Sequence, residues 1–423
     1  MIVNWRSMRI FFVLIFALVL VVGLAVTFAT TAQAQTETTL YSFTGASDGY
    51  APFGGLLLNS SGNLYGTTFF GGTVSGSCNG CGTVFQLTRN AGTWTFNTLH
   101  SFAGSPTDID HPSGQMVFDP AGNIYGTAEE GGGSNNCCGG IFELSHSQSW
   151  AESLISIFHR NNGQSPVGLT YHERSLYGTT TFGRATQGNQ TGFGTVYQLS
   201  QKDGVWERSI IYAFTGESDG YEPNGWLAFD QQGNLYGSTP YGGNGSGDVY
   251  ELGPTASEWD LNVIADVSSG SMIFDQSGNL YGSLPGGGSS NCLGGCGSIV
   301  ELQNTGIGWN VITLYEFADV TDGEEPGSLV FDANGNLYGT TFLGGTGTCQ
   351  FFQFSGCGTV FKLTPGSSGW QKTTLYNFMG GSDGEFPNGA PLVMDSSGNL
   401  YGGTVGGITY GTAGYGTIYE IQP

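Results

Sequence analysis

All eight cysteines of the chain occur as close pairs in glycine-rich segments, and their type and spacing allow two kinds of chemistry. Pairing within each segment in an oxidising compartment is the simplest interpretation. Zinc is the alternative, but it favours four ligands from two such pairs, and the repeats that carry these pairs are not all neighbours. We therefore predict disulfides, although a bridge between adjacent cysteines would be strained. The pairs are Cys78/Cys81, Cys137/Cys138, Cys292/Cys296 and Cys349/Cys357.

Aspartates recur in the motif Asp-Gly-x-x-Pro, which begins at Asp48, Asp219, Asp322 and Asp383. Carboxylates gathered on one face would suit calcium, which takes oxygen ligands. The alternative is an Asx-type turn followed by a proline that starts the next strand. Near-identical repetition favours the turn, because a ligand site usually breaks symmetry. Calcium is the one possible ion that we retain, and no other cofactor is predicted.

The segment between Cys349 and Cys357 contains Phe351, Phe352 and Phe354, and no other copy of the repeat has this feature. Exposed apolar side chains often form a binding surface, so the loop is a candidate binding tip. The three rings would otherwise fold onto the neighbouring structural unit. Both interpretations remain open from the sequence.

Few features of the sequence indicate catalysis. The five histidines lie between His100 and His172 but fall on different predicted strands, turns and loops. The sequence Gly-x-Ser-x-Gly occurs in three of the repeated connections, at Gly45–Gly49, Gly216–Gly220 and Gly380–Gly384, but no helix is predicted there to form a nucleophile elbow. The chain contains no phosphate-binding loop or zinc-protease helix motif. A pair of carboxylates for glycoside hydrolysis stays an alternative, because acids are abundant. We predict no catalytic residue.

The elements that position these residues come from a repeat with seven copies of Leu-Tyr-Gly or Ile-Tyr-Gly. The interval between copies varies from 45 to 63 residues, which suits the four-stranded blade of a propeller. In one copy the predicted strands are Leu329–Asp332, Leu337–Thr341, Thr359–Leu363 and Trp370–Phe378. The third copy is one residue shorter and lacks the turn glycine, which predicts a two-residue hairpin turn. The repeated tyrosines are Tyr65, Tyr125, Tyr177, Tyr236, Tyr281, Tyr338 and Tyr401.

The two ends of the repeat region complement each other. Thr38–Phe43 reads as a fourth strand without a blade, and Thr417–Ile421 reads as a third strand with nothing after it. Pairing of these two segments would close a ring and remove exposed sheet edges. We therefore predict an all-β fold in which residues 35–423 form a single seven-bladed β-propeller of four-stranded antiparallel blades.

The amino-acid sequence of the repeat resembles that of a known family. Gly62–Thr68 with Gly82–Leu87, and Gly335–Thr341 with Gly358–Leu363, look like the GloVer tandem repeat of exported bacterial proteins. The resemblance covers nearly all of Thr38–Pro423. It implies a secreted or surface protein, and the family offers no established catalytic residues to transfer.

The N-terminus and the charge balance limit location and partners. Arg6 and Arg9 precede an apolar run over residues 10–29, and the Ala32-x-Ala34 pair suits signal-peptidase cleavage, so residues 1–34 are predicted to be a signal peptide. Retention of the run as a membrane anchor is the alternative. The 33 acidic side chains outnumber the 10 basic ones, which excludes nucleic acid and anionic membranes as partners.

The functional expectation is an extracytoplasmic binding module that is secreted, periplasmic or attached to the cell surface. Its ligand would be an extracellular carbohydrate or protein. A secreted polysaccharide hydrolase or lyase and a structural envelope protein are the alternatives. The ring fold itself does not decide among them.

Overall fold

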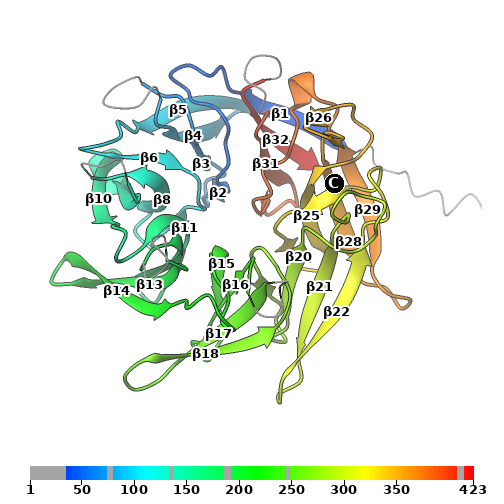
Figure 1. The fold of residues 1–423 in the computed structure, drawn as a ribbon. Coiled ribbons are helices and arrows are strands. Elements are labelled where there is room, and N and C mark those ends of the chain that lie inside the picture. The colour runs from blue at the N-terminus through cyan, green and yellow to red at the C-terminus, as the bar shows by residue number, and fades with distance from the viewer. Residues whose placement is uncertain are drawn as a thin grey trace, which may run out of the picture.

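The structure is a computed structural model that describes residues 35–73, 80–133, 137–184, 192–242, 245, 247–406 and 414–423. The predicted signal peptide lies outside these residues. Seven antiparallel sheets stand around a central opening, as Figure 1 shows. We number the sheets as blades one to seven in chain order, starting from the sheet that contains β2. Among the residues that the structure describes, no helix combines the length and apolar character needed to cross a membrane.

The first three blades each run from an inner to an outer strand, in the order of the chain. Blade one contains β2 (Leu57–Leu58), β3 (Leu64–Thr68), β4 (Thr83–Asn90) and β5 (Thr93–Ser101). Blade two contains β6 (Ile109–Pro112), β7 (Val117–Phe118), β8 (Ile124–Gly131), β9 (Gly140–Ser145) and β10 (Ala151–Ile157), with β6 and β7 both paired to β8. Blade three contains β11 (Gln164–His172), β12 (Ser175–Phe182), β13 (Thr195–Lys202) and β14 (Val205–Ala213).

The remaining blades follow the same order. Blade four contains β15 (Asn224–Phe229), β16 (Leu235–Thr239), β17 (Asp248–Pro254) and β18 (Trp259–Ala265). Blade five contains β19 (Ile273–Phe274), β20 (Leu280–Leu284), β21 (Ser298–Asn304) and β22 (Trp309–Glu316). Blade six contains β23 (Glu324–Pro326), β24 (Val330–Phe331), β25 (Leu337–Leu343), β28 (Thr359–Thr364) and β29 (Gln371–Asn377). Blade seven contains β30 (Val393–Met394), β31 (Leu400–Thr404), β32 (Thr417–Gln422) and β1 (Thr36–Ser42).

Ring closure occurs where the sequence predicts it. Strand β1 pairs antiparallel with β32, in a register that runs from Thr36 opposite Gln422 to Ser42 opposite Thr417. The two ends of the chain therefore share blade seven, where blue β1 lies beside red β32 in Figure 1. This pairing gives β32 a partner on its outer side, so the predicted seven-bladed fold is confirmed.

The core lies between neighbouring blades. One cluster joins Tyr65 and Val84 of blade one to Ile124 and Phe142 of blade two. Another joins Leu64 and other side chains of blade one to Tyr401 and Ile418 of blade seven. Since each cluster draws on two blades, a single blade could not bury its own apolar face.

The repeated hairpin between the first two strands of a blade is held by its aspartate. Asp332 Oδ1 accepts hydrogen bonds from the backbone amides of Asn334 and Asn336 at 2.8 and 2.9 Å. Its Oδ2 accepts from the Asn336 side chain and from the Tyr338 hydroxyl. Gly335 has a φ of 79°, which glycine adopts without strain. The motif therefore closes the hairpin and orients the repeated tyrosine.

Blade three confirms the prediction of a shorter turn. His172 pairs directly with Ser175, so Glu173 and Arg174 form a two-residue turn. Both have positive φ angles, 47° and 64°, as a type I′ hairpin turn requires.

Candidate functional site

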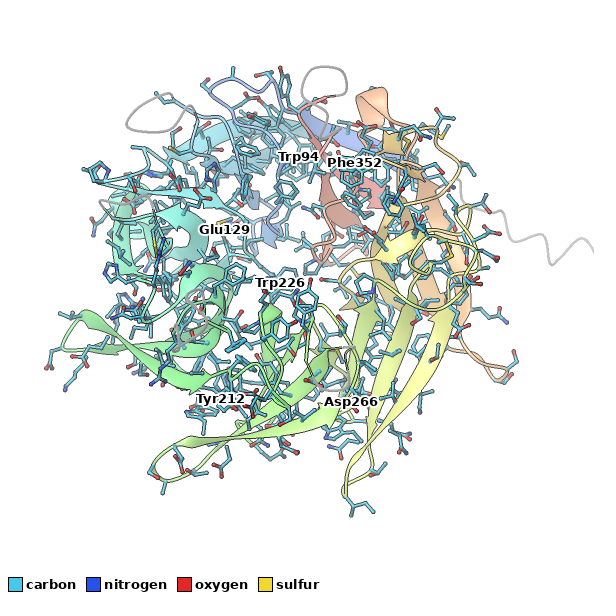
Figure 2. All side chains as sticks on the ribbon, in the orientation of Figure 1. Trp94, Glu129, Tyr212, Trp226, Asp266 and Phe352 are labelled. Atoms are coloured by element: carbon cyan, nitrogen blue, oxygen red, sulfur yellow. A yellow bond between two sulfur atoms is a disulfide. The ribbon has the colours of Figure 1, made fainter. Side chains whose placement is uncertain are left out.

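The aspartates of the Asp-Gly-x-x-Pro motif lie in the connections between blades, where each binds a tyrosine of the preceding fourth strand. Asp48 Oδ2 accepts hydrogen bonds from the Tyr41 hydroxyl and the Thr44 amide at 2.9 and 2.8 Å. Asp219 makes the equivalent bond with Tyr212, at 3.0 Å. Figure 2 labels Tyr212, which comes from the fourth strand of blade three. We call each such pair a Tyr–Asp latch.

The other two predicted aspartates form the same latch. Asp322 accepts from Tyr315 at 2.8 Å, and Asp383 accepts from Tyr376 at 3.0 Å. The four carboxylates thus lie in four separate connections. Within the described ranges, none of them joins a group of three possible metal ligands. This geometry matches the turn interpretation, and calcium binding by these residues stays a prediction.

The latch also affects ionisation. Burial and the carboxylate of Asp48 raise the pKa of Tyr41 to about 12. Burial alone would raise the pKa of Asp48, but hydrogen bonds from Thr44 and Tyr41 outweigh it and lower that pKa. The Asp48 carboxylate is therefore held in its charged form by groups of its own loop.

The last two residues of the Asp-Gly-x-x-Pro motif contact the preceding blade. The residue before the proline has a φ between 50° and 60° in six connections. Its amide donates to the preceding blade in several of them, as Phe386 does to the Cys357 carbonyl at 2.9 Å. Pro387 then lies against Gly358, where an added Cβ would be 2.4 Å from the proline Cδ. The six residues are Ala51, His111, Ser165, Glu222, Glu325 and Phe386.

Three predicted disulfides are present: Cys137–Cys138, Cys292–Cys296 and Cys349–Cys357. Cys81 is also disulfide-bonded, and its predicted partner Cys78 lies outside the described residues. These bridges confirm the prediction of disulfides over zinc ligation for the three described pairs.

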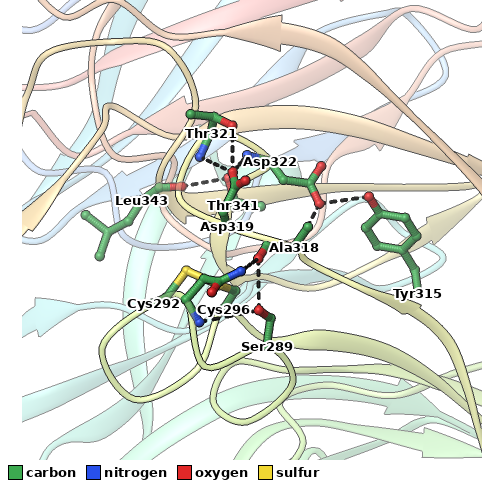
Figure 3. The surroundings of a disulfide bond; sticks show 11 residues. Ser289, Cys292, Cys296, Tyr315, Ala318, Asp319, Thr321, Asp322, Thr341 and Leu343 are labelled. Carbon is green, nitrogen blue, oxygen red and sulfur yellow. Dashed lines mark hydrogen bonds between the residues drawn. A yellow bond between two sulfur atoms is a disulfide. The ribbon is translucent and has the colours of Figure 1, made fainter.

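The cysteine loops lie on the same face as the connections between blades. Figure 3 shows the Cys292–Cys296 bridge beside Ala318, which belongs to the connection after β22. The Ala318 carbonyl accepts hydrogen bonds from Ser289 Oγ at 2.9 Å and from Asn291 Nδ2 at 2.7 Å. The loop is therefore anchored to the blade boundary.

The phenylalanine loop combines two packed rings with one exposed ring, so each predicted arrangement holds for part of it. Strand β26 (Gln350–Phe351) pairs with β27 (Phe354–Ser355), so the loop is a small hairpin. Phe351 packs against Phe342 and Phe386, with ring centroids 5.4 and 5.6 Å apart, and Phe354 joins the same cluster. Phe352, at the tip, is 87% exposed. The ring of Phe352 is thus the most available of the three to a partner.

The central opening holds a cavity of about 740 Å³, lined by the first strands of all seven blades. Its wall is largely apolar, with residues such as Val117, Ile273 and Val330. The indole of Trp226 is the largest side chain on this wall, and Figure 2 shows it beside the opening. It lies so close to Gly168 that a Cβ there would be 1.9 Å from the indole Cδ1.

Trp226 was missed by reasoning from the sequence, although a signal exists. The residue just before the first-strand apolar run is glycine, serine, glutamine or proline in the other blades. The seven residues in chain order are Gly55, Gln115, Gly168, Trp226, Ser271, Ser328 and Pro391. Comparison of the copies at this position would have singled out the tryptophan.

A second hollow of about 780 Å³ lies at the hairpin-turn end of the cavity and shares part of its wall. Asp332 and Asp395 come from two different blades and line this hollow. Both carboxylates are bound by the amides and tyrosines of their own turns. They belong to the repeat and hold the hairpins closed.

The histidines occupy unrelated positions. His172 stacks on Phe229 with ring centroids 3.9 Å apart, and His146 contacts Trp150. His100 takes the place of the latch tyrosine between blades one and two, with its Nε2 3.6 Å from Asp108 Oδ2. Glu152 completes a group with these two residues, and its pKa is raised by burial and by the charge of Asp108.

Comparison with known proteins supports the fold. The extracellular domain of a protein described as a one-component system, from B. thetaiotaomicron, matches with a TM-score of 0.52 and 11% identity. That match covers 92% of this chain and 41% of the other. No curated protein matches the sequence.

Two further solved structures match over about three quarters of the chain. One, from Thermus thermophilus, is described as an oxidoreductase (glucose dehydrogenase); it has a TM-score of 0.46 and 15% identity, with coverage of 75% of this chain and 98% of the other. The other is a gluconolactonase from Xanthomonas campestris, with a TM-score of 0.42, 15% identity and coverage of 74% and 87%.

The model of the Gloeobacter/Verrucomicrobia repeat matches residues 23–188 and 267–423, which together make up most of the chain. These ranges include both of the segments in which the sequence resembles the repeat most fully, Gly62–Leu87 and Gly335–Leu363. The chain therefore belongs to the Gloeobacter/Verrucomicrobia repeat family.

Proposed function

We propose that the protein is an exported binding module that takes up a neutral carbohydrate in its central cavity. The observation that carries this proposal is the position of Trp226 on the wall of a cavity of about 740 Å³. Ligand pockets commonly have volumes of roughly 300–1,000 Å³ and mostly apolar walls with a few polar groups. The cavity has both properties, because Gln115 and Ser328 interrupt its apolar lining.

A sugar ring suits this wall chemically. The C–H groups of a pyranose form a flat apolar face that can stack on an indole, while its hydroxyls need polar partners. Gln115 offers an amide and Ser328 a hydroxyl near the same wall. The net charge of −23 disfavours anionic sugars by repulsion.

Binding is favoured over hydrolysis by the state of the nearby carboxylates. A glycosidase needs two carboxyl groups free to act as acid and as base or nucleophile. The carboxylates of Asp332 and Asp395 are already engaged by turn amides and tyrosine hydroxyls. Export is supported by the disulfides, which persist in oxidising compartments, and by the predicted signal peptide.

A glycan-array screen of residues 35–423 tests the proposal, with and without calcium. We expect the wild-type protein to bind a neutral glycan, Trp226→Ala to abolish the signal and Trp226→Phe to retain part of it. Phe352→Ala is the matched control, because it removes an exposed aromatic ring outside the cavity. Absence of any bound glycan, or loss of binding in Phe352→Ala but not in Trp226→Ala, would overturn the proposal.

A further inference from the structure

Blade two departs from the repeat where β6 meets β8. Asp110 lies directly opposite Glu130 in this antiparallel pair. The same positions in blades one and four hold stacked aromatic pairs, Tyr50 with Phe70 and Tyr221 with Tyr241, whose centroids are 5.1 Å apart in both cases. Like charges directly opposite each other destabilise a sheet. Two acids at this place therefore need a compensating interaction.

The next residue, His111, brings a nitrogen to the two acids. His111 Nδ1 lies 3.6 Å from Asp110 Oδ1 and 3.8 Å from Glu130 Oε2. One oxygen of each acid and this nitrogen lie within 4.8 Å of one another. The side chains are 1% exposed for Asp110, 19% for His111 and 53% for Glu130.

Within the described part of the chain, the carboxylate of Asp110 is buried without any group to satisfy its hydrogen-bonding capacity. Both of its oxygens are buried and have no hydrogen-bond partner among the described residues, and the same is true of His111 Nδ1. A separation of 3.6 Å is too long for a hydrogen bond between them. A buried, unsatisfied carboxylate costs several kcal/mol (order of magnitude), so such groups normally bind a partner or a metal.

A charged His111 would not balance the group. Its single positive charge would face the carboxylates of Asp110 and Glu130, with Glu129 next to Glu130 in the chain. Glu129 lies beside the central opening in Figure 2 and is bound by Ser113. A divalent cation would supply two positive charges and a ligand position for the unsatisfied oxygens of Asp110.

We infer that Asp110, His111 and Glu130 form a binding site for a divalent transition-metal ion such as Zn²⁺ or Mn²⁺. One imidazole nitrogen with two carboxylate oxygens suits these ions, whereas Ca²⁺ takes oxygen ligands almost exclusively. The exposed position of Glu130 leaves the ion open to water or to an external ligand.

The surroundings orient the histidine. Its ring lies 4.7 Å from the ring of Phe69 and 5.3 Å from that of Phe70, both from blade one. Its backbone amide donates to the Cys81 carbonyl at 2.9 Å. These contacts hold the imidazole toward the two acids, as the surroundings of metal-binding histidines usually do.

Metal titration of the untagged protein, first stripped with a chelator, tests the inference. Calorimetry with ZnCl₂ and MnCl₂ should show one bound ion per chain, accompanied by a rise in melting temperature, and CaCl₂ should bind far more weakly. We expect His111→Ala and Asp110→Asn to weaken binding by at least about 100-fold, more than the loss of a supporting contact would. Blade one has Ala51 at the position of His111, with a φ of 54°, so alanine is compatible with this backbone.

Two controls make the result specific. Glu324→Gln changes the buried acid that occupies the position of Asp110 in blade six, and should leave the affinity unchanged. His100→Tyr restores the latch tyrosine in the neighbouring His100–Asp108–Glu152 group and should also leave it unchanged. No stoichiometric binding of either ion by the wild-type protein would overturn the inference. So would equal affinities of the wild-type and His111→Ala proteins, or loss of binding in His100→Tyr alone.

Discussion

The ammonium group of Lys372 lies 2.7 Å from the Oδ1 carboxylate oxygen of Asp322, across the boundary between blades five and six. Lys372 lies two residues after Trp370, near the start of the fourth strand. The residue at the equivalent position of other blades also contacts the preceding blade. In blade one, Phe96 stacks on Tyr41 with ring centroids 4.1 Å apart. In blade three, Arg208 Cζ lies 4.0 Å from the ring centroid of Phe158. Glu152 faces the His100–Asp108 pair. One position of the fourth strand thus joins neighbouring blades through four different kinds of contact.

Replacement of Lys372 by methionine should destabilise the protein by about 2–4 kcal/mol, because it leaves the Asp322 carboxylate without its charge partner. The Lys372 side chain is only 3% exposed, so water cannot replace the lost contact fully. Urea unfolding monitored by circular dichroism measures the change. Lys202→Met, at an exposed position, is the control and should cost no more than about 0.5 kcal/mol. Equal losses in the two variants would show that the ion pair contributes nothing.

Replacement of Gly358 by alanine should be far more destabilising than replacement of Gly398. Both glycines have positive φ angles, 90° and 87°, so the backbone strain of about 1–2 kcal/mol is common to the two variants. A Cβ at Gly358 would meet Pro387 of the next connection at 2.4 Å, whereas one at Gly398 meets nothing within 4 Å. The difference between their unfolding free energies measures the close packing around Gly358, which includes this contact between blades and the Thr341 carbonyl oxygen of blade six, 2.5 Å from the same Cβ. Similar losses would mean that the Gly–Pro contact does not determine how blades pack.

The fold was predictable because its determinants are local and repeated. The hairpin of Asp332 closes through its own amides, and the segment Thr38–Phe43 is recognisable as a fourth strand by comparison with Trp370–Phe378. The Tyr–Asp latch also repeats, although its tyrosine partner lies seven residues away and was not identified from the sequence.

The candidate sites were less predictable because they depend on departures from the repeat. Asp110 and Glu130 are neighbours only through the register of β6 with β8, which the irregular connection before β7 obscures in the sequence. Lys372 and Asp322 are 50 residues apart and meet only when two blades pack. Trp226 could have been found by aligning the copies, whereas the cavity that it lines requires the closed ring.

Removal of the Cys349–Cys357 disulfide should loosen its loop and leave the propeller folded. The bridge closes a short segment, so its contribution to global stability should be below about 3 kcal/mol. The exposed ring of Phe352 is a natural site for chymotrypsin. We expect the Cys349→Ser, Cys357→Ser double variant to be cleaved there several times faster than the wild-type protein.

The matched control for this experiment is the Cys292→Ser, Cys296→Ser double variant, which removes a bridge from blade five and leaves the phenylalanine loop intact. Mass spectrometry of the early fragments identifies the cleaved bond in each protein. Cleavage after Phe352 at the same rate with and without the Cys349–Cys357 bridge would show that the packing of Phe351 alone holds the loop.

Stability should depend on pH through Asp248, the first residue of β17. Burial, followed by the charge and hydrogen bond of Asp266 and the charge of Asp219, raises the pKa of Asp248 from 3.8 to about 6. The folded protein therefore holds this proton at a pH where the unfolded chain has released it. The stabilisation from Asp248 is complete below about pH 4 and is lost as the pH rises through 6, by at most ~3 kcal/mol.

The variant Asp248→Thr should remove this dependence and raise stability at pH 7.5. Other blades have threonine at the same place, where Thr68 and Thr83 share a hydrogen bond of 2.8 Å. The hydroxyl of Thr239, opposite Asp248, is buried and has no hydrogen-bond partner among the residues that the structure describes. Urea midpoints at pH 5 and pH 7.5 test the prediction, with the exposed Asp260→Asn as control. The increase in urea midpoint of Asp248→Thr over the wild-type protein should be larger at pH 7.5 than at pH 5. If the two proteins instead lost stability in parallel over this range, the charge of Asp248 would not be the cause.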